Sequence, residues 1–235
     1  MEAAFRQRPK VFLFSNPNNP TGTVHDEETL RLIAELAIRY DVIVIADELY
    51  SRLVYDGRPY THLATIDGMR ERTVSLLGPS KTESMSGYRL GVAVAQAAIV
   101  DRMEDVQSIA ALRAPAYAQH TLRHWIRDDH ELVAERVRDY QALRDMAVKA
   151  FNSTNFIRAT PSGGTSYLFP RLIGIDASDQ EVALRLQDEA GVIINPGYQS
   201  GERGTGHFRI CFAQDERVFA NALDRIVSVL SSLRS

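Results

Sequence analysis

A strand, a loop, a helix and a second strand follow one another in the first 46 residues, and this order strongly constrains the fold. The run Val11–Ser15 is short and apolar, and it ends in a turn-forming stretch at residues 16–22. Apolar side chains then recur at helical spacing behind an acidic first turn, which predicts a helix over residues 26–39. Residues 42–46 are all apolar and largely β-branched, as is typical of a parallel strand covered on both faces. The order predicts a β-α-β unit and an α/β fold.

After residue 46, the pattern predicts further strands, then a stretch of helices, and then strands mixed with helices. Further strands are predicted at residues 73–77, 90–95, 156–159, 165–172, 192–194 and 208–212. Further helices are predicted at residues 97–112, 116–127, 131–151, 179–190 and 215–233. We therefore expect a large α/β domain at residues 1–120 and a smaller α+β domain at residues 121–235. No linker rich in Pro, Gly or Ser marks the boundary between them.

Composition and charge exclude several classes of function. The 235 residues are 45% hydrophobic and 24% charged, which is usual for a globular protein and excludes disordered and fibrous chains. The net charge of −3 creates no field that would attract nucleic acid or anionic lipid, so neither is an expected partner. No apolar run approaches the ~20 residues that span a membrane. With a single cysteine and no apolar secretion signal, a cytoplasmic location is expected.

Polar side chains follow three of the predicted strands. Asn19 follows the first strand, Asp47 and Tyr50 follow the second, and Lys81 follows the third. In a parallel sheet, ligands bind beyond the carboxyl ends of the strands, where these side chains would lie. A carboxylate directly after a buried strand is costly unless a cation or a donor pairs with it. Arg89 follows Lys81 by eight residues, and its charge would favour the neutral amine that forms Schiff bases.

Two histidines, His120 and His124, have the spacing of a metal pair on a helix. Thr121 stands where a zinc protease has its glutamate, so we interpret the pair as solvent-facing and predict no metal site.

Four motifs together resemble those of the class I/II aminotransferases, which are fold type I enzymes that depend on pyridoxal 5'-phosphate (PLP). They are the loop NPNNPTG at residues 16–22, the pair Asp47 and Tyr50, the stretch SKTESMSGYRLG at residues 80–91, and FRICFA at residues 208–213. Each motif alone is weak, but their shared order and internal spacings are specific. The resemblance covers nearly the whole chain. It implies a transferase that moves an amino group from an amino acid to a 2-oxo acid. The implied fold is an incomplete PLP-transferase large domain, with a mostly parallel sheet and helices, followed by a small C-terminal α+β domain.

The resemblance also assigns roles around the cofactor. Lys81 matches the lysine that binds PLP covalently and later moves the proton at the substrate α-carbon. Asp47 matches the carboxylate that pairs with the pyridine nitrogen and keeps the ring an electron acceptor. Tyr50 and Asn19 match donors to the phenolic oxygen of the cofactor. Arg89 matches a phosphate ligand, because a guanidinium fork suits phosphate geometry.

One further role concerns the substrate. Arg209 matches the arginine that binds the substrate α-carboxylate and so fixes which α-carbon bond stands perpendicular to the cofactor ring. Cys211 alternates with it, and we expect a small core residue there. Each candidate also has an ordinary structural interpretation. The strand-end aspartate could be a helix N-cap, the asparagine a turn residue, the lysine and its neighbouring arginine solvated charges, and the late arginine the partner of a surface acid.

The chain departs from the family pattern at its N-terminal end. Ahead of the loop at residues 16–22, members of the family carry a phosphate-binding turn, an aromatic ring that stacks on the pyridine, and a tyrosine lent to a neighbouring subunit. Gly78 also stands where many members have a phosphate-binding hydroxyl. We therefore expect the chain to act with a missing N-terminal segment, as a homodimer or as the complement of a separate N-terminal half.

Two alternatives remain open. Residues 78–89 also resemble the PLP-dependent L-arginine oxidases and hydroxylases of biosynthetic pathways, which pass carbanion electrons to oxygen. The other alternative is an inactive aminotransferase-like fragment.

Overall fold

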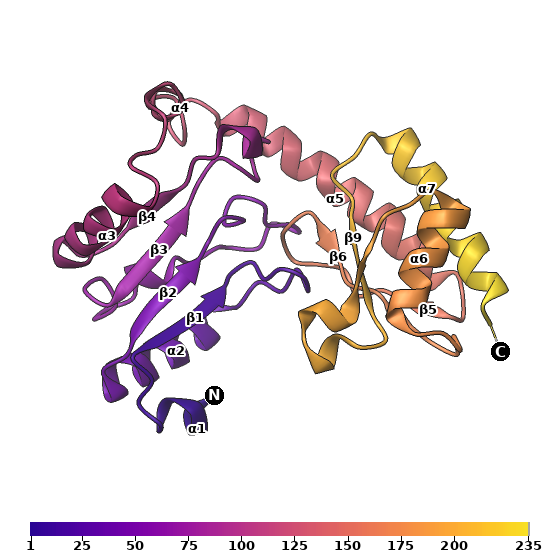
Figure 1. Ribbon diagram of the computed structural model, residues 1–235, viewed down its shortest axis with the longest axis horizontal. Coiled ribbons are helices and arrows are strands. Elements are labelled where there is room, and N and C mark those ends of the chain that lie inside the picture. Colours follow the sequence, from indigo (N-terminus) through magenta and orange to yellow (C-terminus); the bar gives the residue numbers. More distant parts are fainter. Residues whose placement is uncertain (235) are drawn as a thin grey trace. The chain divides into compact units, whose positions relative to one another are not determined.

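The chain forms two compact units along its length (Figure 1). The computed structural model describes residues 1–234. Unit 1 comprises residues 1–18 and 24–136, and unit 2 comprises residues 19–23 and the chain from residue 137 onward. The loop at residues 19–23 thus packs with unit 2 although it connects two elements of unit 1. The predicted boundary between residues 120 and 121 stays a prediction, because compactness alone does not define an independently folding domain.

Unit 1 is built on a four-stranded sheet with the order β1-β2-β3-β4. Strands β1 (Val11–Ser15), β2 (Ile43–Asp47) and β3 (Thr73–Leu77) are parallel, and β4 (Val92–Val94) is antiparallel to β3. Asp47 pairs with Ser15 on one side and with Leu76 on the other. The three parallel strands therefore end at the same edge, and the predicted mostly parallel sheet is confirmed.

Helix α2 (Glu27–Tyr40) connects β1 to β2, as the β-α-β pattern predicts. The Asp26 carboxylate accepts the Thr29 N–H at 2.8 Å and so caps its first turn. Asp41 ends the helix in the left-handed conformation. The core of this unit is formed by buried side chains of α1 (Glu2–Phe5), α2 and β2, namely Phe5, Leu30, Ile33, Ala34, Leu36, Ala37 and Val44, with Val42, Leu63 and Met69 from the connecting segments.

The two faces of the sheet differ in burial. Val44 is fully buried, whereas its neighbours Ile43 and Ile45 on the opposite face are half-buried. On β1, Val11 and Leu13 share that opposite face and are 48% and 65% exposed. The expectation that residues 42–46 are covered on both faces therefore holds for one face only in the described chain.

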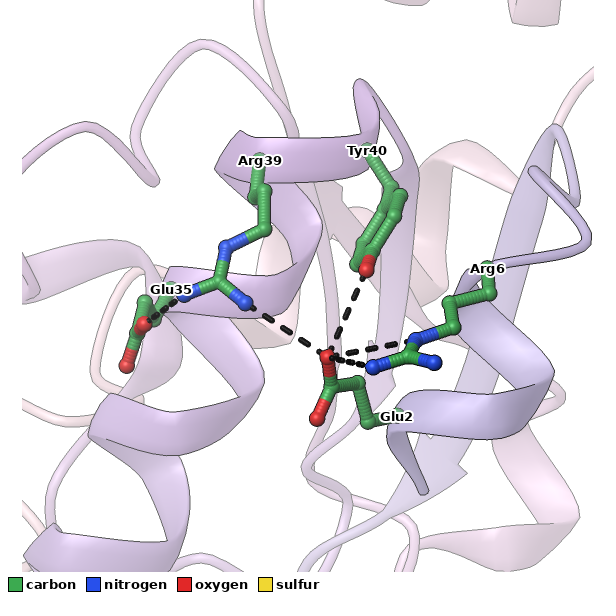
Figure 2. Close-up of polar contacts among 5 residues, drawn as sticks. All are labelled: Glu2, Arg6, Glu35, Arg39 and Tyr40. Carbon is green, nitrogen blue, oxygen red and sulfur yellow. Dashed lines mark hydrogen bonds and ion pairs between the residues drawn. The ribbon is translucent and has the colours of Figure 1, made fainter.

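A cluster of polar side chains joins α1 to the end of α2 (Figure 2). Glu2 Oε1 accepts from Arg6 Nη2 at 3.1 Å and from the Tyr40 hydroxyl at 3.5 Å, and it lies 3.6 Å from Arg39 Nη1. Arg39 also pairs with Glu35 one turn earlier. The Arg6 guanidinium lowers the pKa of the Glu2 carboxyl. The charged side chains of this cluster are solvent-exposed, so the cluster orients α1 more than it stabilises the unit.

The remaining elements of unit 1 are helical. They are η1 (Leu63–Thr65), η2 (Ser86–Tyr88), α3 (Ala97–Ala110), α4 (Ala116–Thr121) and the first part of α5 (His130–Asn152), which continues into unit 2. The predicted helix over residues 116–127 was too long, because Ile126 has φ +70°, a left-handed conformation that an α-helix cannot contain.

Within residues 1–234, no helix is long and apolar enough to cross a membrane.

Unit 2 combines short antiparallel strands with helices. Its elements after α5 are β5 (Ile157–Arg158), β6 (Tyr167–Leu168), β7 (Arg171–Leu172), α6 (Asp179–Ala190), β8 (Asn195–Pro196), η3 (Gly197–Ser200), η4 (Glu202–Gly204), β9 (Phe208–Cys211) and α7 (Glu216–Ser232). One sheet has the order β6-β9-β8, and β5 pairs with β7. The predicted α+β character of this part is confirmed.

Two strand predictions for unit 2 need correction. The single strand predicted at residues 165–172 is two strands, since Pro170 between them has no N–H to donate to a ladder. The strand predicted at residues 192–194 was wrong, and β8 begins only at Asn195. Gly191 is left-handed and the Val192 N–H bonds the Leu186 carbonyl at 3.0 Å, so this segment closes the end of α6 instead.

Candidate functional site

The six predicted site residues fall into two groups. Unit 1 holds Asp47, Tyr50, Lys81 and Arg89. Unit 2 holds Asn19 and Arg209. Each group is described within its own unit.

Asp47 and Tyr50 lie at the carboxyl end of β2. Asp47 is the last residue of the strand, and its Oδ1 accepts the Leu49 N–H at 3.3 Å. The segment that follows is a turn and not a helix, so the interpretation of Asp47 as a helix N-cap is wrong. Tyr50 is 5% exposed. The end of β2 therefore places a partly accessible carboxylate close in sequence to a buried phenol.

Lys81 lies in the turn that follows the neighbouring strand β3. Its Nζ is 5.8 Å from the centroid of the Tyr50 ring. The preceding Ser80 donates its hydroxyl to the Leu90 carbonyl at 3.1 Å, which ties the two ends of this turn together. The structure thus brings the predicted lysine and the predicted tyrosine together at one edge of the sheet, as expected for the ends of adjacent parallel strands.

Gly78 and Arg89 flank the lysine turn. A Cβ at Gly78 would lie 3.3 Å from both the Gly91 Cα and the Leu90 carbonyl oxygen, so close packing of backbone favours glycine at this position. Arg89 is exposed and has φ +52°, and its Nη1 donates to the Ser86 carbonyl at 2.9 Å. Its guanidinium is thereby oriented by its own turn. Its predicted role at a phosphate stays a prediction.

A buried carboxylate that sequence reasoning missed lies directly behind Asp47. Glu48 is 1% exposed, and its Oε2 is 3.2 Å from His62 Nδ1. The Tyr60 hydroxyl is within hydrogen-bonding distance of Glu48 Oε1 at 3.1 Å and of the Asn16 carbonyl at 2.7 Å. The bond to Glu48 raises the pKa of His62, and burial together with the same carboxylate raises the pKa of Tyr60 far above its ordinary value. This group holds Asn16, the residue that directly follows β1.

A second missed group connects the segments that follow β2 and β3. Arg52 Nη1 lies 2.5 Å from Glu83 Oε1, and its two terminal nitrogens lie 2.8 and 2.6 Å from the two carboxylate oxygens of Asp129. Trp125 Nε1 donates to Glu83 Oε1 at 3.1 Å. Burial raises the pKa of Glu83, and the bonds from Arg52 lower the pKa of Asp129. In the sequence, this ion pair is visible only as two opposite charges. Arg52 stands two residues after Tyr50, and Glu83 stands two residues after Lys81.

Arg209 is held by neutral groups in unit 2. Its Nη1 donates to Asn19 Oδ1 at 3.0 Å, and its Nη2 donates to Asn195 Oδ1 at 2.6 Å. The Arg209 Cζ also lies 4.3 Å from the centroid of the Tyr167 ring. These contacts orient the guanidinium without neutralising it, which leaves its charge for a carboxylate ligand. The interpretation of Arg209 as the partner of a surface acid therefore does not describe these contacts.

The partners of Arg209 come from strand pairing that the sequence does not display. Asn195 of β8 pairs directly with Arg209 of β9, and Tyr167 of β6 pairs with Cys211. In β9, Phe208 and Ile210 are buried on one face, whereas Cys211 shares the face of Arg209 and is exposed. The prediction that Cys211 is a small core residue was wrong because strand alternation places it on that face.

The loop that carries Asn19 is anchored by Gly22. The Gly22 carbonyl accepts the N–H groups of Gly163 and Gly164 at 2.9 and 3.0 Å. Gly22 has φ +69°, and a Cβ there would lie 2.2 Å from the Cβ of Ser162. Only glycine fits this close approach, and the approach holds Asn19 beside the arginine.

One histidine of the predicted pair, His124, contacts a nearby carboxylate. His124 Nδ1 lies 2.7 Å from the Asp128 carboxylate four residues later in the turns that follow α4, and both side chains are exposed. Across residues 1–234, no group of three or more His, Cys, Asp or Glu side chains is arranged to hold a metal ion.

Comparisons with known proteins agree with this arrangement. The family model described as "Aminotransferase class I and II" matches residues 1–226. The chain is 32% identical over 232 residues to aromatic-amino-acid aminotransferase 2 of Thermococcus litoralis and 32% identical over 226 residues to an aspartate aminotransferase of Pyrococcus abyssi. These matches cover 98% and 95% of the chain, but 59% and 58% of the relatives.

A solved structure shows the same similarity in three dimensions. An aspartate aminotransferase from Rhodobacter sphaeroides superposes with a TM-score of 0.96 at 42% identity. The match covers 100% of this chain and 59% of that protein. The chain therefore spans about three fifths of the length of the proteins it matches.

Proposed function

The chain belongs to the class I and II aminotransferase family, and on that premise we propose that it supplies the lysine-bearing part of a PLP-dependent aminotransferase. PLP is the cofactor of this family. The observation that carries the proposal is the position of Lys81 beside the buried Tyr50 ring, at the sheet edge where Asp47 ends the adjacent strand. A lone lysine in a solvated loop would have no such surroundings.

The donor set in unit 1 fits PLP. The carboxylate of Asp47 suits a protonated pyridine nitrogen, and the Tyr50 phenol suits an anionic phenolic oxygen. Lys81 supplies the amine for covalent attachment, and Arg89 supplies a guanidinium for the phosphate. When bound, PLP supplies the electron-accepting ring that stabilises negative charge at the substrate α-carbon. We propose that Asn19 is a further donor to the phenolic oxygen.

Lys81 is proposed to act twice. Its amine first holds the cofactor, and once an amino acid has replaced it, the free amine accepts the proton from the substrate α-carbon. The same amine would then pass that proton to the cofactor. Because one group performs both transfers, replacement of Lys81 is expected to abolish amino-group transfer rather than slow it modestly.

Arg209 is proposed to bind the substrate α-carboxylate through a bidentate contact. Its guanidinium is oriented by Asn19, Asn195 and the Tyr167 ring, and these partners carry no negative charge that would compete with the substrate. An oriented carboxylate restricts rotation of the substrate about its bonds to the cofactor. We expect the same contact to serve both the amino acid and the 2-oxo acid, since both carry this carboxylate.

The wider context is proposed from the family and the composition. We propose a homodimer, or assembly with a separate N-terminal half, as the active form, and a cytoplasmic role in amino acid metabolism and biosynthesis. The arginine oxidase and the inactive fragment are not carried forward, because the matched relatives are named as aminotransferases and the proposed site residues are all present.

The proposal is tested by measuring the transfer of nitrogen from an amino acid to a 2-oxo acid. The purified chain is incubated with PLP, a ¹⁵N-labelled amino acid and an unlabelled 2-oxo acid, and mass spectrometry measures ¹⁵N in the newly formed amino acid. Transfer is expected with the natural chain and with the control Lys149→Ala, whose lysine is exposed on α5, and not with Lys81→Ala. Equal transfer by Lys81→Ala would overturn the proposed role of Lys81, and transfer by none of the three would overturn the homodimer of this chain as the active form.

A further inference from the structure

Arg52 connects the two segments that carry the proposed cofactor residues. It lies two residues after Tyr50, and its partner Glu83 lies two residues after Lys81. A single ion pair with a nitrogen–oxygen distance of 2.5 Å thus links the turn after β2 to the turn after β3. The side chains of Arg52 and Glu83 are 20% and 6% exposed, so solvent screens this pair far less than a surface pair.

Several contacts hold the Arg52 guanidinium in one orientation. Asp129, just before α5, accepts from both terminal nitrogens of the guanidinium and is 13% exposed. Such a two-point contact orients the planar fork as well as binding it. Trp125, on the same segment as Asp129, donates to the Glu83 oxygen that Arg52 contacts. Glu83 is therefore held from two directions.

Arg52 compensates the negative charge of two carboxylates. One cation faces two carboxylates, Glu83 and Asp129, and the second oxygen of Glu83 is buried without a hydrogen-bond partner in the described chain. Removal of the guanidinium would leave the Glu83 carboxylate uncompensated in a place where it cannot be solvated. Glu83 would then take up a proton or turn toward water, and in either case the ionic link between Arg52 and the turn that contains Lys81 would be lost.

We propose that Arg52 is a positioning residue that acts through Glu83 to hold the Lys81 amine beside the Tyr50 ring. The inference rests on the proposed function, because it assigns Arg52 a role toward the lysine that would carry PLP. It also gives a role to Arg52, which lies outside the motifs, and to Glu83, which lies within one of them. Arg52 itself does not contact the substrate or the reacting atoms in this role.

The chain offers a test that needs neither cofactor nor turnover. It contains three lysines, Lys10, Lys81 and Lys149, of which Lys10 and Lys149 are exposed and Lys81 is half-buried. Limited reductive methylation with formaldehyde and a borohydride reagent modifies amines according to their accessibility. Peptide mass spectrometry then gives the methylation of Lys81 relative to Lys149 in the same sample, and this ratio corrects for differences in the extent of reaction between samples.

The variants separate positioning from general stabilisation. In Arg52→Met, the ratio of Lys81 to Lys149 methylation should rise at least about twofold, the change that corresponds to a coupling of ~0.5 kcal/mol. The matched control is Arg58→Met, which removes an exposed arginine from the same connecting segment and should leave the ratio unchanged. Arg52→Lys keeps the charge without the fork and should give an intermediate ratio.

Two further variants cover the case in which Arg52→Met fails to fold. Glu83→Gln keeps the shape of the side chain and should raise the ratio, because the ion pair to the lysine turn is lost. Asp129→Asn leaves the pair between Arg52 and Glu83 and should have a smaller effect. An unchanged ratio in the folded Arg52 and Glu83 variants, or a rise in Arg58→Met as large as theirs, would overturn the inference.

Failure of the inference can be told apart from failure of the proposed function. If Lys81 does not bind PLP, borohydride reduction will attach no pyridoxyl group to it in the natural chain, while the methylation ratio will still respond to Arg52. If Arg52 does not position the lysine, the natural chain will bind PLP through Lys81 and the methylation ratio will not change.

Discussion

Gly22 is the position at which a single added methyl group should most disturb the loop that holds Asn19. The carbonyl of Gly22 accepts two N–H groups, and its φ of +69° lies in the left-handed region. An added Cβ would lie 2.2 Å from the Ser162 Cβ and 3.0 Å from the Gly164 carbonyl oxygen. Both neighbours belong to backbone or to a short side chain, so neither can rotate away. Gly22→Ala must therefore move the loop or the segment it packs against.

The cost of Gly22→Ala has two parts. A non-glycine residue in the left-handed conformation costs roughly 1–2 kcal/mol. Overpacking of a close contact typically costs about 1–3 kcal/mol more. The free energy of unfolding of the chain should therefore fall by about 2–5 kcal/mol.

Gly174→Ala is the matched control within the same unit. Gly174 has φ +61°, and nothing lies within 4 Å of the point that an added Cβ would occupy, so only the conformational part applies and the loss should be roughly 1–2 kcal/mol. Urea unfolding followed by circular dichroism measures both variants, and hydrogen exchange at Gly163 and Gly164 reports the loop directly. A loss for Gly22→Ala no larger than that for Gly174→Ala would refute the close approach.

Three further predictions concern stability, each measured by urea unfolding. Because Glu48 raises the pKa of His62, the protonated histidine stabilises the folded state fully below its ordinary pKa of 6.5 and loses this effect as pH rises through the raised pKa; His62→Ala should remove that pH dependence, and an unchanged slope would contradict it. Asp179→Ala leaves two backbone N–H groups without their carboxylate acceptor, at about 1–3 kcal/mol for each one that stays buried, whereas a neutral result would mean that water replaces the carboxylate. Phe151→Ala removes a fully buried ring that meets Phe208 edge to face and should cost about 3–5 kcal/mol; a loss below that range would mean that the core closes around the cavity.

Elements with strong local signals were predictable from the sequence. The bounds of β1 and β3 were predicted as they are, and α6 begins and ends where its pattern begins and ends. In α6, Ser178 caps the first turn and Gly191 closes the last, and both signals are visible in the sequence. The failures occurred where backbone conformation overrides residue type, as at Ile126 and at Val192.

Motif spacing predicted roles for Lys81 and Arg209, because those residues stand in patterns a few residues long, and these roles stay predictions. The side chains that contact them could not be predicted from the motifs. The partner Asn195 could not be found in this way, since its contact with Arg209 arises from the pairing of β8 with β9. The contact between Arg209 and Asn19 joins residues far apart in the chain, and only the folded structure brings them together.

Borohydride reduction can locate the lysine to which PLP attaches. PLP is added to the purified chain, borohydride reduces the bond between cofactor and amine, and peptide mass spectrometry compares the pyridoxyl group on Lys10, Lys81 and Lys149. We predict that the half-buried Lys81 carries most of the label, although both other lysines are more exposed. Label that follows exposure, with Lys10 and Lys149 modified as much as Lys81 or more, would contradict it.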